Sequence, residues 1–147
     1  AFALCELDCT LVVLDVDPVT GHLHPRTAVS TLPADDDAGD GSIAAEVRVH
    51  PDGRRVFVSN RRHDSIATFA FESPNEAPTL LGHVPSGGRT PRHFTIDPTG
   101  RLLLVANQDS GTIVSFALDD PSGIPREIGV VAELSQPVCL TFAEVTP

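Results

Sequence analysis

Three polar residues stand at the same point of a recurring pattern. Glu6, Arg61 and Gln108 each follow a short apolar segment that ends in a small or polar residue. A position that served packing alone would favour one residue type in every copy. Glutamate can transfer protons, and arginine makes bidentate contacts with carboxylate or phosphate. The three side chains therefore predict an asymmetric site for a small anionic substrate, with three solvated loop residues as the alternative.

A second group of polar residues opens the apolar segments. Arg92 and His93 begin one segment, and Glu46 holds the position of His93 in the preceding copy, 47 residues earlier. In an antiparallel meander, the first strand starts at the edge where the second strand ends. We therefore expect Glu46, Arg92 and His93 to share a rim with the first group.

A repeat of 47 residues would position these side chains. Residues 51–60 return as residues 98–107, and residues 64–71 return as residues 111–118. An earlier, incomplete copy lies in residues 2–16. Four short strands in about 40–50 residues are typical of one blade of a β-propeller.

The strands of the unit can be read in its second copy. Residues 45–50 alternate between apolar and polar types with the period of a half-buried strand. The Pro-Asp-Gly sequence at 51–53 predicts a turn. Further strands are expected at 55–59 and 65–71, with a short fourth strand near 79–83, and no segment carries a helical stripe. The prediction is an all-β chain, a partial β-propeller of about two and a half four-stranded antiparallel blades.

The two ends of the chain suggest a piece of a larger ring. Residues 136–142 match residues 90–96, so a new copy begins just before the chain stops. The chain also starts without Met inside an apolar run. We expect the last strand to complete a first blade that lies upstream of Ala1. The expected organisation is one domain, 1–147, with blade repeats at about 1–33, 43–85 and 90–134 and a closing strand at 137–143.

Composition excludes several classes of function. The formal net charge is −10, from 10 basic and 20 acidic residues, which argues against a nucleic-acid surface. Much of the acidity comes from four aspartates within 35–40, as expected of a solvated loop. No window is apolar enough for a membrane span. Cys5, Cys9 and Cys139 are expected to be free thiols in a reducing, cytoplasmic compartment, without a metal site. Composition leaves the oligomeric state open.

Several motifs in register resemble the seven-bladed lactonase family, which includes propeller-type 6-phosphogluconolactonases and fungal carboxy-muconate lactonizing enzymes. They are Ala-Ala-Glu-Val-Arg-Val-His-Pro-Asp-Gly-Arg at 44–54, Val-Ser-Asn-Arg-Arg-His-Asp-Ser-Ile at 58–66, Gly-Arg-Thr-Pro-Arg-His-Phe at 88–94 and Ala-Asn-Gln-Asp-Ser at 106–110. The resemblance covers nearly the whole chain and implies a seven-bladed parent. It also implies a cofactor-free enzyme that acts on a lactone or its ring-opened acid.

The resemblance further implies roles for individual residues. Glu6 and Arg61 match positions where a glutamate and arginines of the central cleft have been proposed as catalytic. Arg92 and His93 match the blade-opening Pro-Arg motif, whereas Cys5 departs from the asparagine usual before the glutamate. A further histidine and arginine of the family's cleft have no counterpart in this chain.

The implied reaction is hydrolysis of a 6-phosphogluconolactone-type sugar lactone in carbohydrate metabolism. Glu6 would activate water for attack on the carbonyl, and His93 would donate a proton to the leaving ring oxygen. One of Arg61 and Arg92 would hold the phosphate, and the other would stabilise the oxyanion. The expected site has two groups: catalytic Glu6, Arg61 and His93, and substrate-binding Arg92, Gln108 and Glu46.

Two other functions remain open at this point. A muconate-type cycloisomerase would use the same cleft for proton transfer during lactonization. A non-catalytic propeller would serve as a binding platform, because fold alone does not determine function. In either enzymatic case we expect this chain to be inactive by itself, since other blades supply the remaining walls of the cleft.

Overall fold

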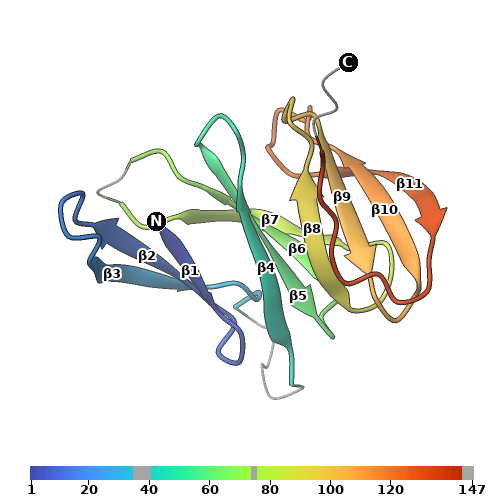
Figure 1. Cartoon of the computed structure of the whole chain (residues 1–147), viewed down its shortest axis with the longest axis horizontal. Coiled ribbons are helices and arrows are strands. Elements are labelled where there is room, and N and C mark those ends of the chain that lie inside the picture. Colours follow the sequence, from blue (N-terminus) through green and yellow to red (C-terminus); the bar gives the residue numbers. More distant parts are fainter. Residues whose placement is uncertain (35–40, 74–75, 144–147) are drawn as a thin grey trace.

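The structure is a computed structural model that describes residues 1–34, 41–73 and 76–143; the acidic run at 35–40 lies outside them. Three antiparallel sheets follow one another along the chain, each with its strands in sequence order (Figure 1). The first contains β1 (Phe2–Cys5), β2 (Thr10–Val16) and β3 (Leu23–Ser30). The second contains β4 (Ile43–Val49), β5 (Arg55–Arg61), β6 (Ser65–Ala70) and β7 (Thr79–Pro85). The third contains β8 (Pro91–Ile96), β9 (Leu102–Asn107), β10 (Thr112–Ala117) and β11 (Arg126–Glu133).

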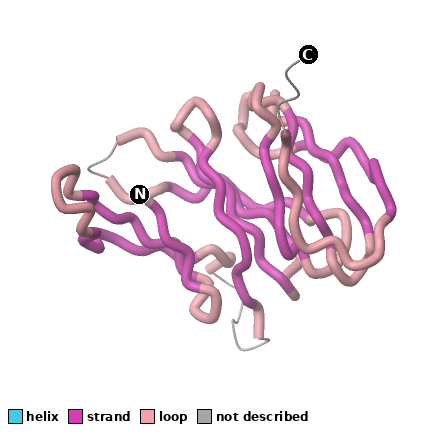
Figure 2. The backbone as a smooth tube through the Cα atoms, viewed as in Figure 1, coloured by secondary structure: helices cyan, strands magenta, loops and turns pink. Residues whose placement is uncertain are grey.

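The described residues contain strands and loops but no helix, which confirms the all-β prediction (Figure 2). The pairing also confirms the repeat. Asn60 lies opposite Ser65 in the second sheet, and Asn107 lies opposite Thr112 in the third. Cys5 lies opposite Thr10 in the same way, so β1 corresponds to β5 and β9. Strand β4 contacts both β1 and β8, which makes β4 and β8 the innermost strands.

Two apolar cores join the three sheets. One lies between the first and second sheets and includes Leu11, Val58 and Phe69; the other lies between the second and third and includes Phe57 and Phe116. Strand β5 contributes to both because each of its faces is covered by a neighbouring sheet. This explains why its sequence reads as a continuous apolar run rather than an alternating one. Burying each such side chain stabilises the fold by roughly 1.5–3 kcal/mol.

Buried asparagines connect each blade to the one before it. The Nδ2 atom of Asn60 donates to the carbonyl of Thr31, the residue after β3, at 2.7 Å. Asn107 donates in the same way to the carbonyl of Ser86, the residue after β7, at 2.9 Å. Cys5 holds the equivalent position in the first sheet and is a half-buried free thiol. It therefore cannot make the amide hydrogen bond of the other two copies.

The turns at the other end of the inner strands also connect blades. Gly100 ends one copy of the predicted turn with a φ of 72°, and its carbonyl lies 2.8 Å from Nε2 of His50. A Cβ atom at Gly100 would lie 2.9 Å from that nitrogen. Glycine is therefore required both by the positive φ and by the close approach of the imidazole.

Residues 137–143 are the segment expected to complete a first blade upstream of Ala1, and that expectation stays a prediction. Among the described residues they are not paired into a strand. They pass beside β8, where the backbone N–H of Leu140 donates to Nδ1 of His93 at 3.2 Å. The imidazole of His93 therefore accepts the backbone N–H of Leu140, which in a paired strand would donate to a backbone carbonyl.

Candidate functional site

An ion pair joins the first two blades at the rim. Nη2 of Arg61, the last residue of β5, donates to Oε1 of Glu6, the residue directly after β1. The same nitrogen lies 3.4 Å from the carbonyl oxygen of Ala44 on β4. Only 13% of the Arg61 side chain is exposed, against 58% for Glu6. The site thus presents an open carboxylate beside a largely buried cation.

Backbone contacts fix Glu6 in this place. Its carbonyl oxygen accepts a hydrogen bond from the N–H of Ala44 at 2.9 Å, which ties the loop after β1 to the inner strand of the next blade. Cys9 ends the loop with a φ of 45°, and its Sγ lies 3.3 Å from the carbonyl of Ser42. The loop that carries Glu6 is therefore held at both ends by the following blade.

The guanidinium of Arg61 has an unused donor. Its Nε is buried and has no hydrogen-bond partner among the described residues. Leaving a buried donor unsatisfied costs roughly 1–3 kcal/mol, and more when the group is charged. A donor of this kind is available to an acceptor from outside the described residues, such as a water molecule or a ligand oxygen.

A second polar cluster lies between the inner strands β4 and β8. Oε2 of Glu46 is 3.2 Å from Nε2 of His93, and Oε1 of Glu46 is 3.3 Å from Nε of Arg48. Nη2 of Arg48 lies 3.2 Å from the same imidazole nitrogen. Glu46 is two residues along β4 from Ala44, which Arg61 contacts, so about 7 Å of strand separates this cluster from the rim pair.

The partners of His93 determine its tautomer. Leu140 donates its N–H to Nδ1, so the proton of the neutral ring is on Nε2 and faces the Glu46 carboxylate; Arg48, which can only donate, then lies beside Nε2 without a hydrogen bond to it. Burial lowers the pKa of His93; the Glu46 carboxylate opposes this, whereas Arg48 and Arg92 lower the pKa further. Cys139 lies 3.9 Å from Nε2. Since protein groups contact both nitrogens, the expected role of His93 as proton donor stays a prediction.

The structure brings together Glu6 with Arg61 and Glu46 with His93. Arg92 is exposed on β8, next to His93, and forms no hydrogen bond or ion pair with the residues described. Gln108 lies at the rim through its backbone, whose N–H donates to the carbonyl of Thr90 at 2.9 Å. Its half-buried side chain makes no hydrogen bond with any described residue, so no contact joins it to the other site residues.

Arg48 is a site residue that the sequence pattern did not identify. It follows Glu46 by two positions on β4, and the period of a strand places both on one face. The same alternation that predicted the strand could have identified it. The signal was obscured because the equivalent residue in the third copy is Thr95, an uncharged residue.

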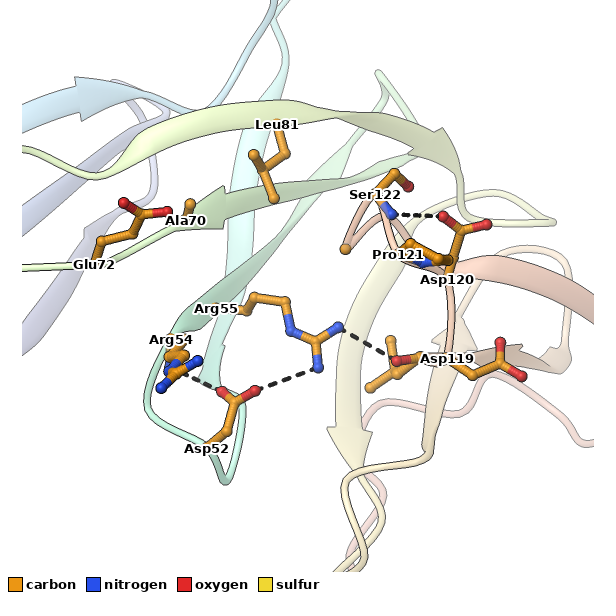
Figure 3. A pocket seen from close by; sticks show the side chains of 12 residues that line it. Asp52, Arg54, Arg55, Ala70, Glu72, Leu81, Asp119, Asp120, Pro121 and Ser122 are labelled. Atoms are coloured by element: carbon orange, nitrogen blue, oxygen red, sulfur yellow. Dashed lines mark hydrogen bonds and ion pairs between the residues drawn. The ribbon is translucent and has the colours of Figure 1, made fainter.

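A hollow of about 430 Å³ lies at the opposite end of the strands. It is lined by β5, β6 and β7 together with the loop after β10. Figure 3 shows Arg55 reaching across it, with Nη1 3.3 Å from the carbonyl of Leu118 and Nη2 3.5 Å from Asp52. None of the predicted site residues lines it. Arg55 acts there as a connection between two blades.

Metal-binding clusters and membrane-spanning helices are both absent from the described residues. No three histidine, cysteine, aspartate or glutamate side chains converge as a metal-binding group in the described parts of the chain. Within the same residues no helix has the length and apolar character needed to cross a bilayer.

Comparison with known proteins agrees with the fold. The family described as "Lactonase, 7-bladed beta-propeller" matches residues 1–142. A 6-phosphogluconolactonase from Bacillus subtilis is 34% identical over 97 residues, which cover 66% of this chain and 27% of that protein. One from Pectobacterium carotovorum is 33% identical over 98 residues, covering 65% and 29%. The chain thus spans less than a third of the length of these relatives.

Solved structures show the same arrangement of blades. A protein from Lactobacillus plantarum superposes with a TM-score of 0.89 at 31% identity, over 97% of this chain and 41% of that one. A periplasmic gluconolactonase from Pseudomonas aeruginosa gives a TM-score of 0.87 at 28% identity, over 99% and 39%. The three sheets are therefore consecutive parts of a seven-bladed β-propeller, and the chain belongs to the seven-bladed β-propeller lactonase family.

Proposed function

We propose that this chain contributes the Glu6–Arg61 part of the cleft of a lactonase that hydrolyses 6-phosphogluconolactone-type sugar lactones. The ion pair at the rim carries the proposal, because it places an open carboxylate beside a desolvated cation. The names of the Bacillus and Pectobacterium relatives support the substrate class.

The pair can perform both steps of lactone hydrolysis. The Glu6 carboxylate takes a proton from a water molecule while the water oxygen bonds to the lactone carbonyl carbon. The Arg61 guanidinium stabilises the oxyanion that develops on the carbonyl oxygen. The ring C–O bond then breaks, and protonated Glu6 returns its proton to the leaving ring oxygen. The product is the ring-opened hydroxy acid, and the Glu6 carboxylate is regenerated.

A chimera tests this role directly. The chain would replace the homologous segment of the Bacillus subtilis 6-phosphogluconolactonase, and hydrolysis of 6-phosphogluconolactone would be measured. We expect Glu6→Gln to lower kcat by about 10²–10⁴-fold, the usual contribution of a general base. Asp8→Asn is the matched control, because Asp8 is an exposed carboxylate in the same loop. Equal kcat in Glu6→Gln and the unmodified chimera would refute the proposal.

The same chimera separates the other functions. Turnover of a muconolactone but not of the phosphorylated lactone would replace the proposed substrate with that of a cycloisomerase. A correctly folded chimera that binds lactones without turnover would indicate a binding platform. Either result would contradict the role proposed for Glu6 in hydrolysis.

A further inference from the structure

We infer that Arg48 and Arg92 form a phosphate-binding subsite on the inner strands, separate from the reacting groups Glu6 and Arg61. This inference rests on the proposed function and makes it more specific. The arginines then have different roles, since Arg61 stabilises the oxyanion on the carbonyl oxygen and the other two hold the phosphate of the substrate.

The balance of charge favours an anion here. Nη2 of Arg48 lies 3.2 Å from Nε2 of His93, and Arg92 directly precedes His93 on β8, near enough to lower the pKa of the imidazole. Glu46 supplies one negative charge, and His93 is held neutral by the N–H of Leu140. The cluster therefore carries a net charge of about +1, whereas the Glu6–Arg61 pair is neutral overall.

The two guanidinium groups are also accessible. The Arg48 side chain is 46% exposed although two of its nitrogens face Glu46 and His93. Arg92 is exposed and has no hydrogen-bond or ion-pair partner among the described residues. A phosphate presents several acceptor oxygens, so it can bind both arginines at once, each by charge-assisted hydrogen bonds.

Spacing is consistent with one substrate spanning both clusters. Arg61 contacts the carbonyl of Ala44, and Glu46 lies two residues further along β4, about 7 Å away. In 6-phosphogluconolactone the phosphorus is five bonds from the carbonyl carbon, through the ring oxygen, C5, C6 and the ester oxygen, a length comparable with the separation of the two clusters. A phosphate at Arg48 and Arg92 would therefore leave the carbonyl near Glu6.

Binding to the 147-residue chain provides the first test. Inorganic phosphate and 6-phosphogluconate would be titrated and followed by NMR and calorimetry, with gluconate as the ligand that lacks a phosphate. We expect Arg48→Gln and Arg92→Gln each to weaken phosphate binding by about fivefold or more. Arg101→Gln is the matched control, because Arg101 is an exposed arginine in the turn at the far end of β8.

The pKa of His93 can be measured to show whether the anion binds next to this imidazole. Sulfate keeps its charge between about pH 5 and 8, so it does not titrate with the imidazole. A dianion at Arg48 and Arg92 stabilises the protonated ring, and we expect sulfate to raise the pKa of His93 in an NMR titration. The shift should be smaller in Arg48→Gln, and circular dichroism would establish that this variant is folded.

The outcomes are distinct from those of the lactonase test. Equal loss of phosphate binding in Arg101→Gln, or no effect of sulfate on His93, would overturn the subsite. Gluconate binding as tightly as 6-phosphogluconate would show a carboxylate site instead, which also overturns it. Phosphate binding that depends on Arg48 and Arg92 would support the subsite even if Glu6→Gln left hydrolysis intact.

Discussion

Glu46 and His93 occupy the same position in two successive inner strands, and their side chains meet with Oε2 3.2 Å from Nε2. Identical blades would bring glutamate against glutamate, and two like charges at this distance would repel. Divergence of the two copies instead places an acid beside a base. Cys139 holds the matching position in the next copy, with Sγ 3.9 Å from the same nitrogen. The site therefore depends on differences between blades rather than on the repeat itself.

This contact predicts that stability depends on pH. The pKa of His93 is lowered in the folded chain, chiefly by burial. The unfolded chain therefore binds this proton at higher pH than the folded chain does. The resulting stability is complete above the unfolded pKa, near 6.5, and is lost as pH falls through the folded pKa.

The measurement is urea unfolding of the chain and of His93→Gln between about pH 7.5 and 5. We expect the difference in unfolding free energy between them to decrease as the pH falls. Asp52 and Asp97 also have lowered pKa values, through hydrogen bonds to their carboxylates against an opposing effect of burial. Their contribution is lost at lower pH, near or below about 4. Parallel curves for the two proteins would contradict the prediction for His93.

The two asparagines that connect the blades predict unequal mutational costs. Oδ1 of Asn60 accepts a hydrogen bond from Oγ1 of Thr31 at 2.7 Å, in addition to the bond that its Nδ2 donates. Oδ1 of Asn107 has no partner among the described residues. We expect Asn60→Ala to lower the free energy of unfolding by about 2–4 kcal/mol and Asn107→Ala by about 1–2 kcal/mol.

Urea unfolding at neutral pH measures both variants. Thr31→Val is the control, since it keeps the Nδ2 bond of Asn60 and removes only the hydroxyl, which contacts Asn60 and, at 3.0 Å, the carbonyl of Cys9; it should cost about 1–2 kcal/mol. A larger loss in Asn107→Ala than in Asn60→Ala would show that the counted hydrogen bonds do not set the cost.

The repeat predicted the architecture because each strand and turn follows from local patterns. The alternation at 45–50 and the Pro-Asp-Gly turn identified the inner strand and its end, and the 47-residue offset showed that Glu46 is equivalent to His93. Glu6 and Arg61 were expected at one rim because each stands where an equivalent strand ends; the structure adds that their side chains form an ion pair. These features depend on backbone geometry, which every copy shares.

Side-chain partners could not be predicted in the same way. Arg48 has no charged counterpart in the third copy, so comparison of copies did not select it. His93 accepts the N–H of Leu140 only because residues 137–143 run beside β8. Such contacts depend on packing between copies, which a one-dimensional pattern does not contain.

Gly88 predicts a steric limit beside the third blade. A Cβ atom at Gly88 would lie 2.7 Å from both Cγ and Nδ2 of Asn107, the asparagine that connects this blade to the second. Asn107 is fully buried and cannot move away without losing its bond to Ser86. We expect Gly88→Ala to lower the free energy of unfolding by about 1–3 kcal/mol, the usual cost of overpacking.

Thermal unfolding would measure the effect of Gly88→Ala. Gly129→Ala is the comparison, because a Cβ atom there meets no atom within 4 Å, although its φ of 139° adds backbone strain. A Gly88→Ala variant as stable as the parent would mean that the asparagine can shift at little cost.

Substitution of Arg61 is expected to lower the activity without lowering the stability of the fold. Its guanidinium is largely buried, with an unsatisfied Nε, while its partner Glu6 is mostly exposed. Removing the cation relieves a desolvation cost, and the exposed carboxylate regains water when the pair is lost. We therefore expect Arg61→Met to change the unfolding free energy of the chain by less than about 1 kcal/mol. In the chimera, the same substitution should lower kcat by about 10²–10³-fold because the oxyanion loses its stabilising charge.

Arg61→Lys distinguishes charge from geometry at this position. Lysine keeps the positive charge but lacks the planar fork that reaches both Glu6 and the carbonyl of Ala44. We expect it to recover part of the lost kcat without improving stability. If Arg61→Met instead lost more than about 3 kcal/mol of stability, the value typical of breaking a required buried ion pair, Arg61 would be a structural residue. Its loss of activity would then follow from unfolding rather than from chemistry, because the carboxylate of Glu6 would no longer have a folded rim to hold it.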